Sequence, residues 1–265
     1  MTTWNPGQYL KFSDERTRPF RDLIAHVPLD APARIVDLGC GPGNGTPALR
    51  ATWPDASIEG VDSSESMIAR ATADNTGPDG APLDPAVSYR VGDLVDWRPL
   101  EPVDLLVSNA TLQWVPGHRA ILTRLADLVA PGGVFAFQVP GNFRAPAHTI
   151  LADLATSDPY DAYTPSTTDR TSADPADYLA DLSRPGWSVD AWETTYLHVL
   201  RGEDPVFEFI AGTHARPVIE SLPAGLAAEF TTEYRRRLRE AFPQAADGTT
   251  VLPFRRVFVV ASRTA

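Results

Sequence analysis

A short apolar strand runs into a glycine-rich loop in Ile35-Val36-Asp37-Leu38-Gly39-Cys40-Gly41-Pro42-Gly43-Asn44-Gly45-Thr46. Glycine has no Cβ, so Gly39, Gly41 and Gly43 would let the backbone come within contact distance of a ligand. The carboxylate of Asp37, just before the glycines, suits an ammonium or sulfonium better than a phosphate. The pattern therefore predicts a ligand-binding turn and favours S-adenosylmethionine as the cofactor.

A dinucleotide is the first alternative, because strand-to-helix turns with the spacing G-x-G-x-x-G or G-x-G-x-x-A bind NAD and FAD. Counted from Gly39, the last position is Asn44, and counted from Gly41 it is Thr46. Only Gly43-x-Gly45-x-x-Ala48 fits, and it lies too far past the strand. The dinucleotide interpretation and a purely structural turn remain as the less favoured alternatives.

The composition and net charge of the chain limit the classes of protein and partner that we expect. The 265 residues are 43% hydrophobic and 22% charged, as in an ordinary globular protein, and the net charge of −11 argues against nucleic acid as the main partner. An anionic substrate would need a local cluster of arginines. Cys40 is the single cysteine, which excludes a disulfide framework and a cysteine-based metal site; we expect it to be a packed side chain, and we expect no metal.

Targeting signals are not evident in the sequence. The residues Met1-Thr2-Thr3-Trp4-Asn5-Pro6 show no basic region followed by an apolar one. No apolar run approaches the ~20 residues needed to span a bilayer. A cytoplasmic location is expected.

Strand-like and helix-like patterns alternate in the first half of the chain, which indicates a parallel sheet covered by helices. The predicted elements there are strands over 34–38, 57–61, 87–91, 103–108 and 134–139, with helices over 47–53, after Ser63 or Ser64, and over 118–129, the last closed by Pro131-Gly132-Gly133. Further on we expect a flexible connection or lid over 157–176, a strand over 187–200, two or three helices over 205–242 and a last strand over 256–261. The prediction is an α/β, Rossmann-like seven-stranded sheet with an antiparallel last strand and a helical insertion between the last two strands.

Ligands of such a sheet bind at the carboxyl ends of the strands. Asp62 follows the second strand, where its carboxylate can accept both ribose hydroxyls, and Asp93 follows the third, within reach of an adenine amine. Past the fourth strand comes Asn109-Ala110-Thr111-Leu112-Gln113-Trp114, beside the expected methionine part. The predicted cofactor-binding residues are Asp37, Gly39, Gly41, Gly43, Asp62, Ser63, Met67, Asp93, Leu94, Asn109 and Trp114.

This set of motifs resembles the class I S-adenosylmethionine-dependent methyltransferases. Within that class the chain is similar to the trans-aconitate 2-methyltransferase family in Trp4-Asn5-Pro6, Tyr9-Leu10-Lys11-Phe12-Ser13, Arg16-x-Arg18-Pro19, the 109–114 motif, Gln138-Val139-Pro140-Gly141-Asn142-Phe143, Trp192-Glu193-Thr194-Thr195-Tyr196-Leu197-His198 and Phe254-Arg255-Arg256-Val257-Phe258. The similarity covers nearly the whole chain. Residues 74–86 look longer than the family's usual connection, and 157–176 match poorly.

The resemblance implies transfer of a methyl group from S-adenosylmethionine to one carboxylate of trans-aconitate or a similar small polycarboxylate, giving a monomethyl ester. A carboxylate is already ionised near neutral pH, so no catalytic acid, base or nucleophile is predicted. The expected organisation is one methyltransferase domain over 1–265, with 1–30 as an N-terminal cap over the site and 201–250 as a helical insertion forming part of the acceptor pocket.

Arginines are expected to hold the remaining carboxylates by bidentate hydrogen bonds. The predicted substrate-binding residues are Tyr9, Arg16, Arg18, Tyr196, His198, Arg216 and Arg255, with Arg256 as a further candidate and core packing as the alternative for the aromatic residues and His198. Two other functions stay open: methylation of a different small acceptor, and a non-catalytic cofactor-binding or regulatory protein.

Overall fold

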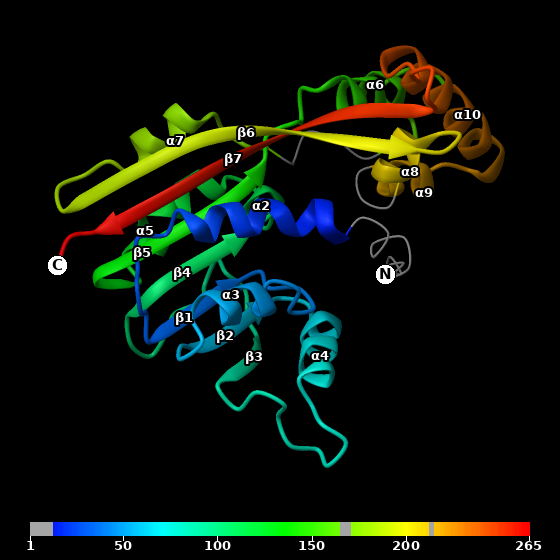
Figure 1. Ribbon diagram of the computed structural model, residues 1–265. Coiled ribbons are helices and arrows are strands. Elements are labelled where there is room, and N and C mark those ends of the chain that lie inside the picture. The colour runs from blue at the N-terminus through cyan, green and yellow to red at the C-terminus, as the bar shows by residue number, and fades with distance from the viewer. Residues whose placement is uncertain (1–12, 165–170, 212–214) are drawn as a thin grey trace. The chain divides into compact units, whose positions relative to one another are not determined.

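A seven-stranded sheet forms the centre of the computed structural model, which describes residues 13–164, 171–211 and 215–265, with the backbone alone for 13–16. Its strands are β1 (Arg34–Leu38), β2 (Ser57–Asp62), β3 (Val87–Val91), β4 (Val103–Asn109), β5 (Val129–Pro140), β6 (Trp187–Arg201) and β7 (Thr249–Arg263). They lie in the order β3-β2-β1-β4-β5-β7-β6, and β7 runs antiparallel to its neighbours (Figure 1). The predicted fold class is confirmed.

Helices connect and cover these strands. Those of the described residues are α2 (Ser13–Ala25), α3 (Thr46–Thr52), α4 (Glu65–Asp74), α5 (Leu122–Ala126), α6 (Pro146–Ala155), α7 (Pro175–Leu182), α8 (Pro205–Ala211), α9 (Arg216–Ser221) and α10 (Ala224–Ala241), with 3-10 turns η1 (Leu112–Trp114) and η2 (His118–Ile121). None of them combines the length and the apolar composition that crossing a lipid bilayer requires.

Parallel pairing brings the carboxyl ends of the early strands to one edge of the sheet. β1 pairs with β2 through Asp37 opposite Gly60, and with β4 through Asp37 opposite Val107. Ile35 and Val36 are fully buried on both faces of β1. This burial explains why β1 and β4 read as apolar runs rather than as an alternating pattern.

The chain divides into two compact units, each with its own core. The sheet unit covers the described residues of 17–139, 172–193 and 257–265. Side chains from β1, β4, β5 and β7 form its core, together with Tyr178 and Leu182 of α7.

The helical unit covers the described residues of 1–16, 140–171 and 194–256. Its core consists of side chains from α6, α8, α9 and α10, among them Leu151, Phe209, Phe230 and Tyr234. Figure 1 shows these four helices gathered around the 194–201 end of β6 and the 249–256 end of β7.

The predicted helix over 118–129 is wrong in type and length. Residues 118–121 form a 3-10 turn, α5 ends at Ala126, and β5 begins at Val129. Pro131-Gly132-Gly133 lies inside β5, where the pairing jumps from Val103 opposite Val129 to Leu105 opposite Val134. The residues of β5 between Val129 and Val134 outnumber those opposite them on β4, so the glycines lie in a bulge within the strand rather than at its start.

Other boundaries also shift. The last strand begins at Thr249, earlier than the predicted residue 256, and α6 was not predicted. The described residues of the predicted helical stretch 205–242 form three helices, as predicted. Of the predicted connection over 157–176, turns occupy 157–164, α7 already begins at Pro175, and 165–170 lie outside the described residues.

A buried polar contact fastens α7 within the sheet unit. The Tyr178 hydroxyl lies 2.7 Å from Nε2 of the buried His118 and accepts a hydrogen bond from the backbone N–H of Ala173 at 3.1 Å. Burial raises the pKa of Tyr178 to about 12 and lowers the pKa of His118. The two side chains are therefore neutral near pH 7, and a hydrogen bond joins the hydroxyl to the imidazole.

Replacing Tyr178 by Phe should lower the free energy of unfolding by about 1–3 kcal/mol, because the buried His118 imidazole and the half-buried Ala173 N–H lose this partner. Urea unfolding near neutral pH measures the change. Tyr163→Phe is the matched control, since Tyr163 is 49% exposed. Equal destabilisation by the two changes would contradict the role given to the Tyr178 hydroxyl.

Candidate functional site

The glycine loop follows β1 and bends onto the end of β2. The backbone N–H groups of Gly39 and Cys40 both donate to the carbonyl of Val61, at 2.7 and 3.1 Å. The loop then enters α3 at Thr46, whose N–H donates to the Gly43 carbonyl at 3.1 Å. The strand, loop and helix predicted from the sequence are thus present.

The three glycines serve different purposes. All have positive φ angles, of 77°, 56° and 82° at Gly39, Gly41 and Gly43. A Cβ on Gly39 would lie 2.1 Å from Cγ2 of Thr111, and a Cβ on Gly43 would lie 2.7 Å from the hydroxyl oxygen of Tyr89. A Cβ on Gly41 would meet nothing within 4 Å. Of these three glycines, Gly41 alone faces open space within the described part of the chain, and a ligand requires such space.

Asp37 is a buried carboxylate. It is 2% exposed, and its Oδ1 atom has no hydrogen-bond partner among the residues that the structure describes. Burial raises the pKa of Asp37 to about 7, and the nearby negative charge of Asp62 contributes. A cation placed at Oδ1 would stabilise the ionised form, so this atom fits the ammonium of a methionine group.

Asp62 holds the loop and the following helix together. Its Oδ2 accepts from the N–H of Gly41 and its Oδ1 from the N–H of Ser64, both at 2.9 Å. Each oxygen keeps a second lone pair, so the carboxylate can still accept two ribose hydroxyls. Ser64 is the N-cap of α4 through the N–H of Met67, whereas Ser63 is exposed.

Past β3 the two predicted residues differ in environment. The Asp93 carboxylate is exposed, and its Oδ1 accepts from the N–H of Val95 at 2.9 Å, which closes a local turn. The Leu94 side chain instead packs in the core of the sheet unit. The Asp93 carboxylate is therefore accessible to a ligand. Packing of the Leu94 side chain in the core holds the backbone at this position in place.

Hydrogen bonds with Gln138 and with the glycine loop hold residues 109–111 in place. The Gln138 side chain donates to Asn109 Oδ1, and the Gln138 carbonyl accepts from the N–H of Ala110 at 2.9 Å. Thr111 Oγ1 donates to the Gly39 carbonyl at 3.0 Å, which joins this segment to the glycine loop. Ala110 has φ of 52°, a conformation that non-glycine residues rarely adopt.

Gln113 is a residue that the sequence reasoning did not select. It is 4% exposed, its Nε2 donates to the Ala110 carbonyl at 2.6 Å, and its Oε1 has no hydrogen-bond partner in the described ranges. The feature of the sequence that could have indicated Gln113 is its position within the 109–114 motif. The neighbouring Trp114, which was selected, is 50% exposed.

Cys40 is the packed side chain that the sequence predicts. It is buried, and its thiol lies 3.4 Å from the Gly41 carbonyl. Burial and the nearby Asp37 raise the pKa of this thiol, so it is not an activated nucleophile. Within the described ranges, no group of three or more His, Cys, Asp or Glu is arranged to hold a metal ion.

Two predicted acceptor residues share one face of β6 in the helical unit. Tyr196 and His198 are both buried, and the residues between and beside them are exposed. The His198 ring packs against Phe209 and Phe254, with ring centroids 5.1 and 5.6 Å apart. The Arg256 guanidinium lies 4.6 Å from the centroid of the same Phe254 ring. Arg256 therefore joins His198 in one aromatic cluster.

The predicted arginines have other partners. Arg216 Nε pairs with Glu220 at 2.6 Å, and Arg255 donates to the Gly141 carbonyl at 3.1 Å. Arg18 is 71% exposed and lies 3.9 Å from Asp22. Tyr9 and the Arg16 side chain lie outside the described residues.

Comparison with known proteins adds an independent result. A methyltransferase domain family matches residues 11–173. The chain is 49% identical to a trans-aconitate 2-methyltransferase of Streptomyces avermitilis, covering 99% of this chain and 98% of the relative. It is 45% identical to one of Methylobacterium nodulans, covering 100% of both.

A solved structure supports the fold. The phosphoethanolamine N-methyltransferase 2 of Haemonchus contortus, in complex with S-adenosylhomocysteine, matches with a TM-score of 0.55 at 15% identity, covering 94% of this chain and 53% of that one. At this identity the match concerns the fold alone. The full-length relatives carry the assignment: this chain belongs to the trans-aconitate 2-methyltransferase family of S-adenosylmethionine-dependent methyltransferases.

Proposed function

We propose that this protein transfers a methyl group to one carboxylate oxygen of trans-aconitate and forms a monomethyl ester. The observation that carries the proposal is the similarity to relatives of that name along their whole length. S-adenosylmethionine supplies an electrophilic methyl group on a sulfonium. We place the reaction in the cytoplasm, with a small polycarboxylate and no nucleic acid as partner.

The residues of the sheet unit suit the parts of the cofactor. Asp37 Oδ1 would accept from the ammonium, the open side of Gly41 would admit the ligand, and Asp62 would accept the ribose hydroxyls. Ser63, Met67, Asp93 and the Leu94 backbone would surround the adenosine, and Asn109 and Trp114 the methionine part. Gly39 and Gly43 shape the loop.

No side chain has to remove a proton in this reaction, because a carboxylate is ionised near neutral pH. The raised pKa of the Cys40 thiol agrees with the absence of a covalent step. Catalysis would consist of aligning the acceptor oxygen with the methyl carbon and excluding water.

Arg256 is the arginine that we assign to the acceptor, ahead of Arg255. Neighbouring residues of a strand point to opposite faces, and Arg256 shares the Phe254 ring with His198, whereas Arg255 faces Gly141. A planar guanidinium can bind a carboxylate by two hydrogen bonds. Residues 201–250 would contribute to the acceptor pocket, and residues 1–30 would cap the site.

Cofactor binding should release a proton through Asp37. In the free protein the pKa of Asp37 is about 7, so the carboxyl is mostly protonated at mildly acidic pH, and an ammonium at Oδ1 would favour its ionised form. We expect release of about one proton per S-adenosylhomocysteine bound near pH 6, well below the ~7.7–8.0 of an α-amino group. The binding enthalpy in buffers of different ionisation enthalpy measures the release.

Asp37→Asn is the control and should bind the same ligand more weakly without releasing a proton. The raised pKa also affects folding: ionising Asp37 costs free energy, so the free energy of unfolding of the free protein falls as pH rises toward about 7. Asp37→Asn removes this fall. Equal proton release by the two proteins would contradict the ammonium assignment.

Arg256→Lys should raise the KM for trans-aconitate by about tenfold or more, because lysine keeps the charge but loses the bidentate contact. The affinity for S-adenosylhomocysteine should stay nearly unchanged. Arg255→Lys, on the opposite face of β7, is the matched control. A higher KM in Arg255→Lys alone would transfer the assignment to Arg255.

Mass spectrometry of reactions offered trans-aconitate, cis-aconitate, citrate and a neutral phenol tests the acceptor class. We expect methyl esters of the tricarboxylates, with trans-aconitate preferred. Methylation of the phenol alone would favour a different small acceptor, and cofactor binding without any turnover would favour a non-catalytic protein.

A further inference from the structure

The phenol ring of Tyr89 fills space that two glycines leave free. A Cβ on Gly60 of β2 would lie 2.6 Å from Cδ1 of Tyr89, and a Cβ on Gly43 of the loop would lie 2.7 Å from its hydroxyl oxygen. Both distances are shorter than side-chain carbons tolerate. The ring on β3 is thus wedged between β2 and the far side of the glycine loop.

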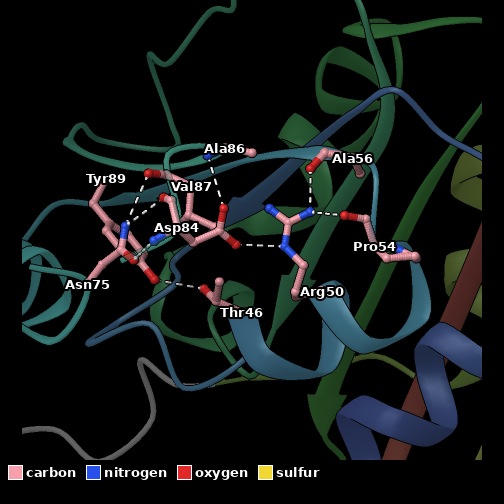
Figure 2. A network of polar contacts seen from close by, with 9 residues as sticks. All are labelled: Thr46, Arg50, Pro54, Ala56, Asn75, Asp84, Ala86, Val87 and Tyr89. Carbon is pink, nitrogen blue, oxygen red and sulfur yellow. Dashed lines mark hydrogen bonds and ion pairs between the residues drawn. The ribbon is translucent and has the colours of Figure 1, made fainter. Parts of the chain in front are cut away.

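The Tyr89 hydroxyl also reaches the start of α3. Figure 2 shows it pointing at Thr46, and the hydroxyl donates to Thr46 Oγ1 at 3.0 Å. Thr46 is buried, and its N–H donates to the Gly43 carbonyl. Because burial raises the pKa of Tyr89, the hydroxyl keeps its proton near neutral pH and remains a donor.

We propose that Tyr89 is a positioning residue for cofactor binding, which holds the Gly43–Thr46 side of the loop so that Gly41 keeps its open face. Gly41 is in turn tied to Asp62 by the hydrogen bond of its N–H. Tyr89 and Asp62 therefore hold the loop at two points, and only Asp62 would also touch the cofactor. The inference rests on the cofactor placement proposed above.

The opposite end of α3 has a separate anchor that does not involve the loop. Arg50 Nε donates to Asp84 Oδ2 at 2.7 Å, and Arg50 Nη1 donates to the carbonyls of Pro54 and Ala56 at 2.7 and 2.8 Å (Figure 2). Asp84 is itself held by Asn75, so this anchor fastens the long connection 74–86 to α3. It provides a matched control on the same helix.

The competing explanation is that Tyr89 only stabilises the fold. In that case the Tyr89 contact and the Arg50 anchor would both lower stability, and the affinity for the cofactor would respond to both in the same way. If Tyr89 positions the loop, the affinity responds to Tyr89 and Thr46 but not to Asp84.

The experiment compares Tyr89→Phe, Thr46→Val, the double variant and Asp84→Asn with the unchanged protein. Calorimetry gives the Kd for S-adenosylhomocysteine, and urea unfolding gives stability. Tyr89→Phe should raise the Kd about three- to tenfold, the effect of one net hydrogen bond. Thr46→Val should do the same, and the double variant should equal either single variant because both remove one interaction.

Asp84→Asn should lower stability while leaving the Kd within about twofold of the unchanged protein. At saturating cofactor, the KM for trans-aconitate should be the same in Tyr89→Phe. An unchanged Kd in both Tyr89→Phe and Thr46→Val, additive effects in the double variant, or an equal rise of the Kd in Asp84→Asn would each overturn the inference. Failure of the unchanged protein to bind S-adenosylhomocysteine would instead overturn the proposed cofactor placement.

Discussion

The hydrogen bond from the Gly41 N–H to Asp62 joins the loop after β1 to the end of β2, and the rest of the cofactor side depends on it. It forms because β1 and β2 run parallel in register, so that both strands end at the same edge. A carboxylate acceptor makes such a bond stronger than a neutral one. Thr111 on one side and Tyr89 on the other then confine the loop and leave Gly41 as its open position.

In the same region, burial of the Asp37 carboxylate raises the free energy of the folded protein without a ligand. Burying a carboxylate whose Oδ1 has no partner among the described residues is unfavourable, and burial raises the pKa of Asp37 to about 7. In the cofactor placement that we propose, the ammonium would remove that penalty, so the free energy stored in the free protein would contribute to affinity. Binding would then stabilise the folded chain through the same contact.

The arginines of the helical unit have different neighbours. Arg235 and Arg239 of α10 pair with Asp204, and Arg216 pairs with Glu220, so these charges are compensated within the unit. Arg256 is buried above Phe254, in the cluster that contains His198. For an acidic protein that binds a polyanion, the local concentration of arginines matters more than their total number.

Much of the sheet unit follows from local sequence. The bounds of β1 and β3 depend on short-range periodicity and are as predicted, and β2 extends one residue further, to include Asp62. Of the two predicted caps of α4, Ser63 and Ser64, the structure has Ser64. The exceptions, at 118–129 and at Pro131-Gly132-Gly133, arise where the pairing of β4 with β5 overrides the local signal.

Contacts between distant residues could not be predicted in the same way. The hydrogen bond from Thr111 to the Gly39 carbonyl joins residues 72 positions apart. The different neighbours of Arg255 and Arg256 depend on which face of β7 meets Phe254 and His198. The sequence by itself determined the fold class, the glycine loop and the order of its carboxylates, because these are local patterns. Only the tertiary structure decided which glycine faces open space, that Oδ1 of the buried Asp37 has no hydrogen-bond partner among the described residues, and that Tyr89 supports the loop, because these depend on what packing brings together from separate strands.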